Sequence, residues 1–132
     1  MQLIDFAQKY INAGFSVVPT NRAKRPTVKT WEQLQKAPMT PAEATEAFRT
    51  AAYIAVITGA VSGNVELIDI DCKWDLEGNL WSGYSSAIQQ AAPDLWAKLT
   101  VQKTQNGGFH LIYRCAQIAG NAKLASRDGT PA

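Results

Sequence analysis

The segment Val65–Cys72, VELIDIDC, constrains the fold most, because it is an apolar run that carries two acids near its end. Its Val, Ile and Leu residues favour a buried β-strand. Side chains alternate between the two faces of a strand, so Asp69 and Asp71 should share one face. Ile68 and Ile70 should face the core on the other side. Packing therefore does not require the acids, and their presence needs a chemical reason.

Two carboxylates on one face of a strand suit a divalent cation. Their Cα atoms would lie about 6–7 Å apart, so their oxygens can converge on one ion or hold two. Carboxylate oxygens favour Mg²⁺ or Mn²⁺, and two acids leave coordination positions for water and phosphate. The nearby Asp75 and Glu77 lack the spacing of an EF-hand. The alternative is an exposed strand end whose acids pair with Lys or Arg.

The composition predicts one globular domain over residues 1–132, since 46% of the 132 residues are hydrophobic. Its 13 Lys and Arg against 11 Asp and Glu give a net charge of +2, which attracts an anionic partner only weakly. Any affinity for nucleic acid must come from a local cluster. Such a cluster follows the first predicted strand, in TNRAKRPTVKTW. Its alternative is a solvated loop with no ligand.

The cysteines and the N-terminus indicate in which cellular compartment the chain is expected. Cys72 and Cys115 lie in separate apolar runs without CxxC spacing, which favours buried reduced thiols over a zinc site or a disulfide. The N-terminal MQLIDFAQKY carries an acid at position 5 and no long apolar core. It therefore predicts neither a signal peptide nor a membrane span, and we expect a soluble, cytoplasmic chain.

The first half of the chain predicts helices interleaved with strands. Apolar residues at helical spacing predict a helix that ends before Gly14, followed by a strand in FSVVP. A short helix is predicted over Trp31–Lys36, and Thr40 with Glu43 predicts a capping box for the helix in TPAEATEAFRT. AYIAVITG and NVELIDID, separated by AVSG, predict two neighbouring strands joined by a tight turn.

The second half predicts a loop in CKWDLEGNLWSGY and a helix over Ser85–Leu99 that restarts at Pro93. TVQKTQ and FHLIYRC then predict a strand pair around the turn NGG, because Asn and Gly tolerate positive φ. This order of elements predicts an α+β fold with a mostly antiparallel sheet.

The only histidine, His110, is predicted on the strand that leaves this glycine turn. Alternation places it on one face with Ile112 and Arg114. The glycines before it would let a ligand approach the backbone closely, and the imidazole could donate a hydrogen bond to a phosphate. The alternative is a purely structural histidine.

Together these pieces resemble the bifunctional primase-polymerase domain of the archaeo-eukaryotic primase superfamily, found in bacterial, phage and plasmid replication proteins. The resemblance covers most of the chain, through GFSVVPT, KRPTVKTW and YIAVITGAVSGNVELIDID. The family's acid-hydrophobic-acid motif is matched by the segment from Asp69 to Asp71, and its small-x-His motif by the segment from Gly108 to His110. The combination is far more specific than either motif alone.

The resemblance implies an RRM-like sheet with flanking helices and an additional N-terminal α/β unit. It implies that Asp69 and Asp71 bind two Mg²⁺ or Mn²⁺ ions, and that His110, with Gly108 before it, contacts the phosphates of an incoming nucleotide. The implied partners are a DNA template or primer, NTPs or dNTPs and, in a full-length protein, a C-terminal helicase domain. No membrane partner is implied.

Basic and aromatic residues supply further candidates. Lys24, Arg25 and Lys29 could contact template or triphosphate, because Lys and Arg provide the phosphate-directed part of nucleic-acid binding. Lys103 and Arg114, which flank the histidine hairpin, are weaker candidates. Three tryptophans could stack on bases, with core or loop-anchoring roles as the alternative. These are Trp31, Trp74 and Trp81.

The family pattern includes a third acidic position on a later strand, followed by a Gly-Gly-Tyr-like segment. The chain ends at Ala132 before either, and Asp128 in AKLASRDGTPA is a poor substitute. We therefore expect a truncated or short relative with two of the three carboxylates, and catalysis by these residues alone is an open question.

The leading hypothesis is a template-directed nucleotidyltransferase, a primase and DNA polymerase. A non-catalytic module that binds single-stranded nucleic acid is the alternative, and a metal-dependent phosphohydrolase would need ligands that the sequence does not offer. The type of product, DNA or RNA, stays open.

Overall fold

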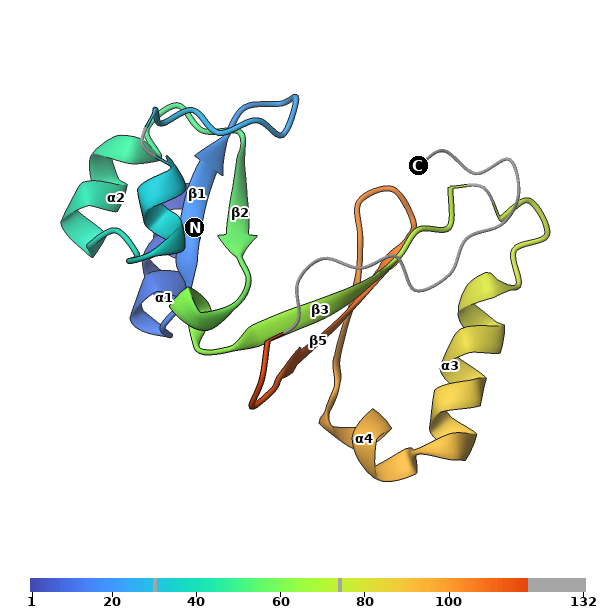
Figure 1. Cartoon of the computed structure of the whole chain (residues 1–132). Coiled ribbons are helices and arrows are strands. Elements are labelled where there is room, and N and C mark those ends of the chain that lie inside the picture. Colours follow the sequence, from blue (N-terminus) through green and yellow to red (C-terminus); the bar gives the residue numbers. More distant parts are fainter. Residues whose placement is uncertain (30, 74, 119–132) are drawn as a thin grey trace. The chain divides into compact units, whose positions relative to one another are not determined.

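The structure, a computed structural model, describes residues 1–29, 31–73 and 75–118 (Figure 1). It confirms the predicted α+β class, because helices accompany strands that pair antiparallel. The chain divides into two compact units, unit 1 (Met1–Val65) and unit 2 (Glu66–Ala132). The single domain over residues 1–132 stays a prediction. Within the described ranges, no helix has the length and apolar character needed to cross a membrane.

Unit 1 combines two α-helices with a two-stranded antiparallel sheet (Figure 1). Its elements are α1 (Leu3–Asn12), β1 (Ser16–Thr20), the 3₁₀ helix η1 (Trp31–Gln35), α2 (Pro41–Ala47), β2 (Tyr53–Ile57) and the 3₁₀ helix η2 (Ala60–Ser62). The capping box of α2 is confirmed: the Thr40 hydroxyl accepts the Glu43 N–H at 3.1 Å, and the Glu43 carboxylate accepts the Thr40 N–H at 3.1 Å. The predicted first helix and strand are confirmed as α1 and β1.

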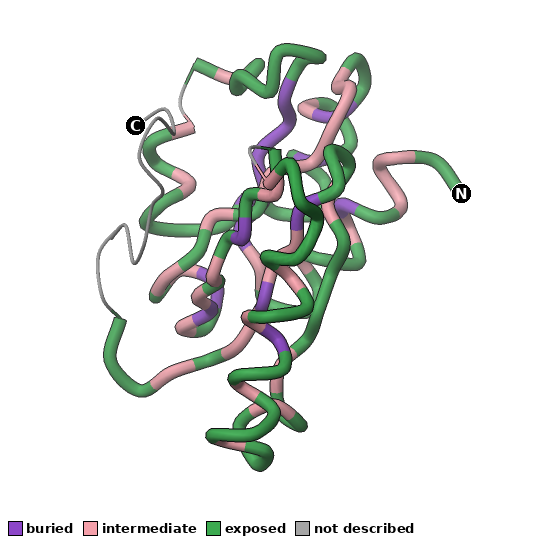
Figure 2. Tube along the Cα trace, turned by 90° about the vertical axis from the view of Figure 1, so that its right-hand side faces the viewer, coloured by how far each residue is buried: buried purple, intermediate pink, exposed green. Residues whose placement is uncertain are grey.

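The core of unit 1 lies between its helices and its sheet. Every residue of β1 is buried, and Figure 2 marks such buried stretches of the chain in purple. Ala7 of α1 and Ala44 of α2 pack with Val17, and Phe48 closes the cluster after α2. The small alanine side chains let both helices lie close to the sheet.

The sequence predicted that β2 and the next strand are neighbours, and this pairing is wrong, although the connection between them is as short as predicted. β2 pairs with β1, and the strand after η2 belongs to the other sheet. Only an isolated bridge joins Gly59 to Val65. Ser62, which is fully buried, fixes this turn to β1, because its hydroxyl accepts the Ser16 N–H at 2.9 Å.

Unit 2 contains a three-stranded sheet and two helices. Its elements are β3 (Val65–Ile70), α3 (Leu80–Ala91), α4 (Pro93–Lys98), β4 (Thr100–Lys103) and β5 (Phe109–Arg114). The strand order is β3-β5-β4, so the histidine strand is central. The predicted hairpin of β4 and β5 is confirmed, and Gly107 in its turn has a φ of +84°. α3 begins earlier than predicted, which places Trp81 in a helix instead of a loop.

Helix α3 packs on one face of this sheet through Trp81. The Trp81 ring stacks on Phe109 of β5, with ring centroids 4.0 Å apart and planes 9° apart. Leu111 is fully buried, and Ile70 is 7% exposed. Because side chains alternate along a strand, the residues between these must face away from α3. Those residues include both motif side chains, Asp69 and His110.

The burial predicted for the cysteines is wrong in degree. Cys72 and Cys115 are each half-buried instead of fully buried.

Candidate active site

Contacts between β3 and β5 define which residues face each other. Tyr113 donates a hydrogen bond to Glu66 at 3.1 Å, and His110 lies beside Asp69. Gly108 lies beside the end of β3, since a Cβ added to it would be 3.7 Å from the Cα of Asp71. Each step forward along β3 is therefore matched by an equal step back along β5, which is the pattern of an antiparallel pair. The acidic motif and the histidine motif thus lie side by side at one end of the sheet.

Asp69 and His110 form a cross-strand pair on the face away from α3. The imidazole Nε2 lies 3.4 Å from Asp69 Oδ1, and the two side chains are 33% and 63% exposed for His110 and Asp69. A pair at such exposure contributes about 0–1 kcal/mol to stability. The Asp69 carboxylate can therefore exchange the imidazole for a cation or ligand at little cost.

Asp71 lies one residue beyond the end of β3. It is exposed, and its Oδ1 accepts the backbone N–H of Lys73 at 2.9 Å. This short turn fixes the carboxylate where the chain leaves the sheet. The buried Ile70 between the two exposed aspartates confirms the predicted alternation along this segment.

Gly108 lets the hairpin end meet β3 at van der Waals distance. A Cβ atom on this residue would lie 2.6 Å from the carbonyl oxygen of Ile70 and 3.7 Å from the Cα of Asp71. Thr104 closes the hairpin, because its hydroxyl accepts the Gly108 N–H at 2.9 Å and its own N–H donates to the Gly108 carbonyl at 2.8 Å. The small residue of the histidine motif therefore has a direct structural reason.

Contacts on the α3 side of the sheet fix the register of β5, the strand that carries His110. Burial, and then the hydrogen bond to Glu66, raise the pKa of Tyr113 above its usual value. The Tyr113–Glu66 contact and the Phe109–Trp81 stack both lie on this face. Sequence reasoning missed Glu66 and Tyr113, although their positions in the two strand patterns place them on that face.

Comparison with known protein families gives a match over most of the chain. Residues 7–130 match the family described as the bifunctional DNA primase/polymerase N-terminal domain, Prim-Pol. The chain belongs to this family. The Prim-Pol match includes both motif segments and elements of both units, and it confirms the resemblance stated from the sequence. No curated protein matches the chain.

The carboxylates of this Prim-Pol chain fit a divalent cation as part of a ligand set. Asp69 and Asp71 offer exposed hard oxygens, the type that Mg²⁺ and Mn²⁺ prefer. No group of three His, Cys, Asp or Glu residues in the described ranges is placed to hold a metal ion. A cation held here would complete its coordination with water and substrate oxygens, as Mg²⁺ commonly does.

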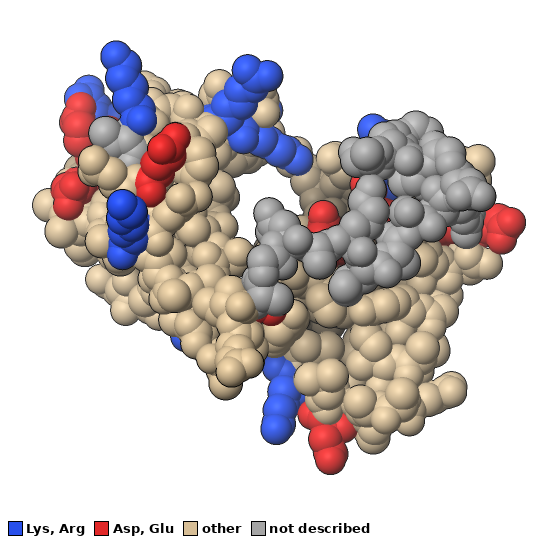
Figure 3. Space-filling model, viewed as in Figure 1, with Lys and Arg blue, Asp and Glu red and all other residues tan. Residues whose placement is uncertain are grey.

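The basic loop of unit 1, residues 21–25, has a defined backbone. The Asn21 side chain accepts the N–H groups of Ala23 and Arg25 at 2.9 and 3.1 Å. Lys24 sits in the left-handed region with a φ of 63°, and both Lys24 and Arg25 are exposed. Figure 3 shows basic side chains projecting from unit 1 where this loop lies. Hydrogen bonds therefore define the backbone positions that carry the basic side chains of this loop.

The structure places the other basic and aromatic residues that the sequence suggested as nucleic-acid contacts. Lys103 is the cross-strand partner of Phe109, so it points to the α3 side, whereas Arg114 shares the His110 face. Trp81 is stacked on Phe109 and so is placed as a packing residue instead of a base platform. Trp31 begins η1 and is half-buried. Trp74 and Asp128 lie outside the described residues.

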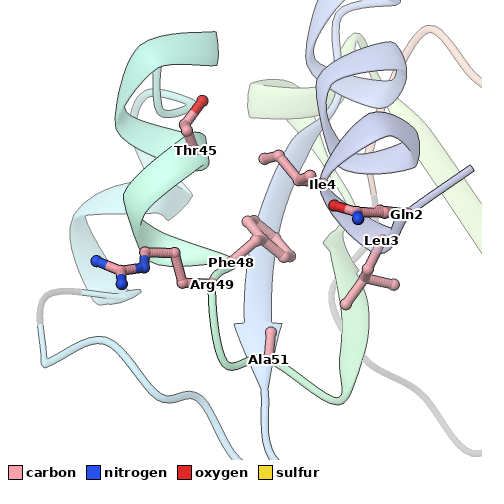
Figure 4. A pocket seen from close by; sticks show the side chains of 7 residues that line it. All are labelled: Gln2, Leu3, Ile4, Thr45, Phe48, Arg49 and Ala51. Atoms are coloured by element: carbon pink, nitrogen blue, oxygen red, sulfur yellow. The ribbon is translucent and has the colours of Figure 1, made fainter.

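A hollow in unit 1 lies between the start of α1 and the end of α2 (Figure 4). Leu3, Ile4 and Phe48 form its apolar part, and Thr45 and Arg49 lie at its edge. Its lining contains no carboxylate or imidazole. It therefore does not suit the chemistry that the two motifs indicate.

Proposed function

We propose that this chain is the nucleotidyltransferase domain of a primase and DNA polymerase. It would extend or start a strand on a DNA template from dNTPs or NTPs, in the replication of a plasmid, phage or mobile element in the cytoplasm. The observation that carries the proposal is the cross-strand pair: Nε2 of His110 lies 3.4 Å from Oδ1 of Asp69 on an exposed face. Family membership supports the reaction class.

The proposed roles follow from the chemistry of each side chain. Asp69 and Asp71 would hold two Mg²⁺ or Mn²⁺ ions, which when bound supply positive charge for the 3′-hydroxyl and the leaving pyrophosphate. His110 would donate a hydrogen bond to a phosphate oxygen of the nucleotide. Gly108 keeps the hairpin against β3, so the two motifs stay adjacent. Little covalent work is needed from the protein, because phosphoryl transfer depends mostly on position and charge.

The basic loop of unit 1 would contact the phosphates of the template or of the nucleotide. Lys24 and Arg25 are exposed and carried on a hydrogen-bonded turn. Lys and Arg contacts to phosphates supply most of the sequence-independent affinity for DNA.

Nucleotide binding with and without metal tests the proposal. A fluorescent dNTP should bind the whole chain in Mn²⁺ or Mg²⁺, and EDTA should weaken binding at least about tenfold, because the carboxylates alone repel the triphosphate. Asp69→Asn combined with Asp71→Asn should also weaken binding in Mn²⁺, because the variant no longer holds the cation. Asp94→Asn, an exposed acid in the first turn of α4, is the matched control and should leave binding unchanged. Equal affinity in EDTA would refute the proposal.

The exposed basic loop favours a second candidate, a non-catalytic module for single-stranded nucleic acid. Such a module would bind an oligonucleotide in EDTA, with affinity that falls steeply as salt rises. Arg25→Ala should then reduce the slope of log K against log[salt] by about 1, and the two aspartate variants should bind as the wild type does. Fluorescence anisotropy of a labelled oligonucleotide measures both. An absence of binding in EDTA at low salt would exclude this candidate.

A further inference from the structure

The exposed face of the unit 2 sheet carries a polar row that continues past the histidine. Gln102 of β4 is the direct cross-strand partner of His110 on β5. Residues directly opposite each other in an antiparallel pair point to the same face. Asp69, His110 and Gln102 therefore form one row across all three strands, with neighbouring strands about 4.8 Å apart.

Gln102 is available to a ligand. It is exposed, and in the described ranges its side chain makes no hydrogen bond. An exposed strand position needs no amide for packing, and a glutamine side chain can both donate and accept. Neither motif of the sequence includes this residue, so pattern reasoning missed it.

The neighbouring rows on the same face have different chemistry. On one side, Leu67 is 36% exposed and lies opposite Ile112 in the same register, and Thr100 is the cross-strand partner of Ile112, so two of the three residues in that row are apolar. On the other side, the row begins with Asp71, which carries negative charge. Phosphates are disfavoured by an apolar row, and an acid repels them where no cation intervenes. The row that runs from His110 to Gln102 is polar, and it adds no negative charge to that of Asp69 at its start.

We propose that Gln102 is a nucleotide-contacting residue that donates a hydrogen bond from its side-chain amide to the terminal phosphate of the incoming triphosphate. The inference rests on the proposed function. In that proposal the phosphate that reacts lies at Asp69 and Asp71, and a phosphate farther along the triphosphate lies at His110. The triphosphate then extends away from the carboxylates, and Gln102 lies one strand beyond the imidazole. Its neutral amide orients the terminal phosphate without adding charge that would hold the released pyrophosphate.

A comparison of triphosphate and diphosphate binding tests the contact. The affinity of the whole chain for a fluorescent dNTP and the matching dNDP is measured in Mn²⁺. Gln102→Ala should weaken dNTP binding about tenfold, the loss typical of one hydrogen bond to a charged group. It should leave dNDP binding unchanged. Gln102→Glu should weaken dNTP binding further, because its carboxylate repels the phosphate.

Gln90→Ala is the matched control, because Gln90 is an exposed glutamine on α3. It should bind both nucleotides as the wild type does, and circular dichroism should show the same fold for all variants. Unchanged dNTP affinity in Gln102→Ala overturns the inference, and so does an equal loss for dNTP and dNDP. If the wild type binds neither nucleotide in Mn²⁺, the proposed function itself fails and this inference fails with it.

Discussion

Replacing Gly108 by alanine should destabilise unit 2 through one backbone contact. The added Cβ would lie 2.6 Å from the carbonyl oxygen of Ile70 and 3.1 Å from the hydroxyl oxygen of Thr104. A carbon normally approaches a carbonyl oxygen to about 3.3 Å, so the hairpin end must move by about 0.7 Å. The main clash is with backbone, so a side-chain rotation cannot relieve it.

Overpacking of this kind costs about 1–3 kcal/mol. Alanine also reduces the entropy of the unfolded chain, which offsets about 0.4–1 kcal/mol of that cost. We therefore expect the free energy of unfolding to fall by about 1–2 kcal/mol. Urea unfolding followed by tryptophan fluorescence measures this change, since Trp81 packs on the same hairpin strand.

Gly83→Ala provides the matched control, because Gly83 lies in α3 and its added Cβ would meet nothing within 4 Å. A glycine in a helix costs about 0.5–1 kcal/mol relative to alanine, so this variant should be more stable than the wild type. The same chemical change is thus expected to act in opposite directions at the two positions. Equal unfolding midpoints for the two variants would refute the reasoning about Gly108.

Two further predictions concern the α3 side of the sheet and the thiol beside the acids. Tyr113→Phe should lower the free energy of unfolding by about 1 kcal/mol, because the hydrogen bond to Glu66 is lost. Burial and Glu66 raise the pKa of Tyr113, so the contribution of its hydroxyl to the free energy of unfolding should be complete below about pH 10 and lost as pH rises through the raised pKa. Identical urea midpoints for Tyr113→Phe and the wild type at pH 8 would contradict this. Burial first, and then neighbouring aspartates, raise the pKa of Cys72. Mg²⁺ bound at Asp71 would offset this negative charge, so it should speed alkylation of Cys72 by iodoacetamide but not that of Cys115. Mass spectrometry measures both rates, and equal acceleration of the two thiols would argue against a cation at Asp71.

The candidate site was predictable because its two motifs depend on local patterns. Alternation along VELIDID placed Asp69 and Asp71 together and turned the isoleucines inward. The turn NGG and the run after it placed His110 on a hairpin strand. Both predictions need only the period of a strand and the conformational freedom of glycine, which are properties of adjacent residues.

Strand partners were less predictable. The segments around AVSG were each correctly predicted as strands, but their mutual pairing was wrong, because β-branched residues favour an extended chain without specifying its neighbour. Buried Ser62 fixes the turn to β1 through the Ser16 N–H, a contact between residues 46 positions apart. Trp81 was likewise predicted in a loop, and its stacking on Phe109 depends on a strand that lies far away in the sequence.

The sequence alone determined the α+β class, the capped helix, the histidine hairpin and the two motifs, because each depends on interactions within a few residues. Only the tertiary structure decided that His110 lies beside Asp69, that Gly108 must be small, and that Gln102 continues their row. These facts depend on the register of three strands. Register arises from contacts such as Tyr113 with Glu66, which form only after distant segments have packed together.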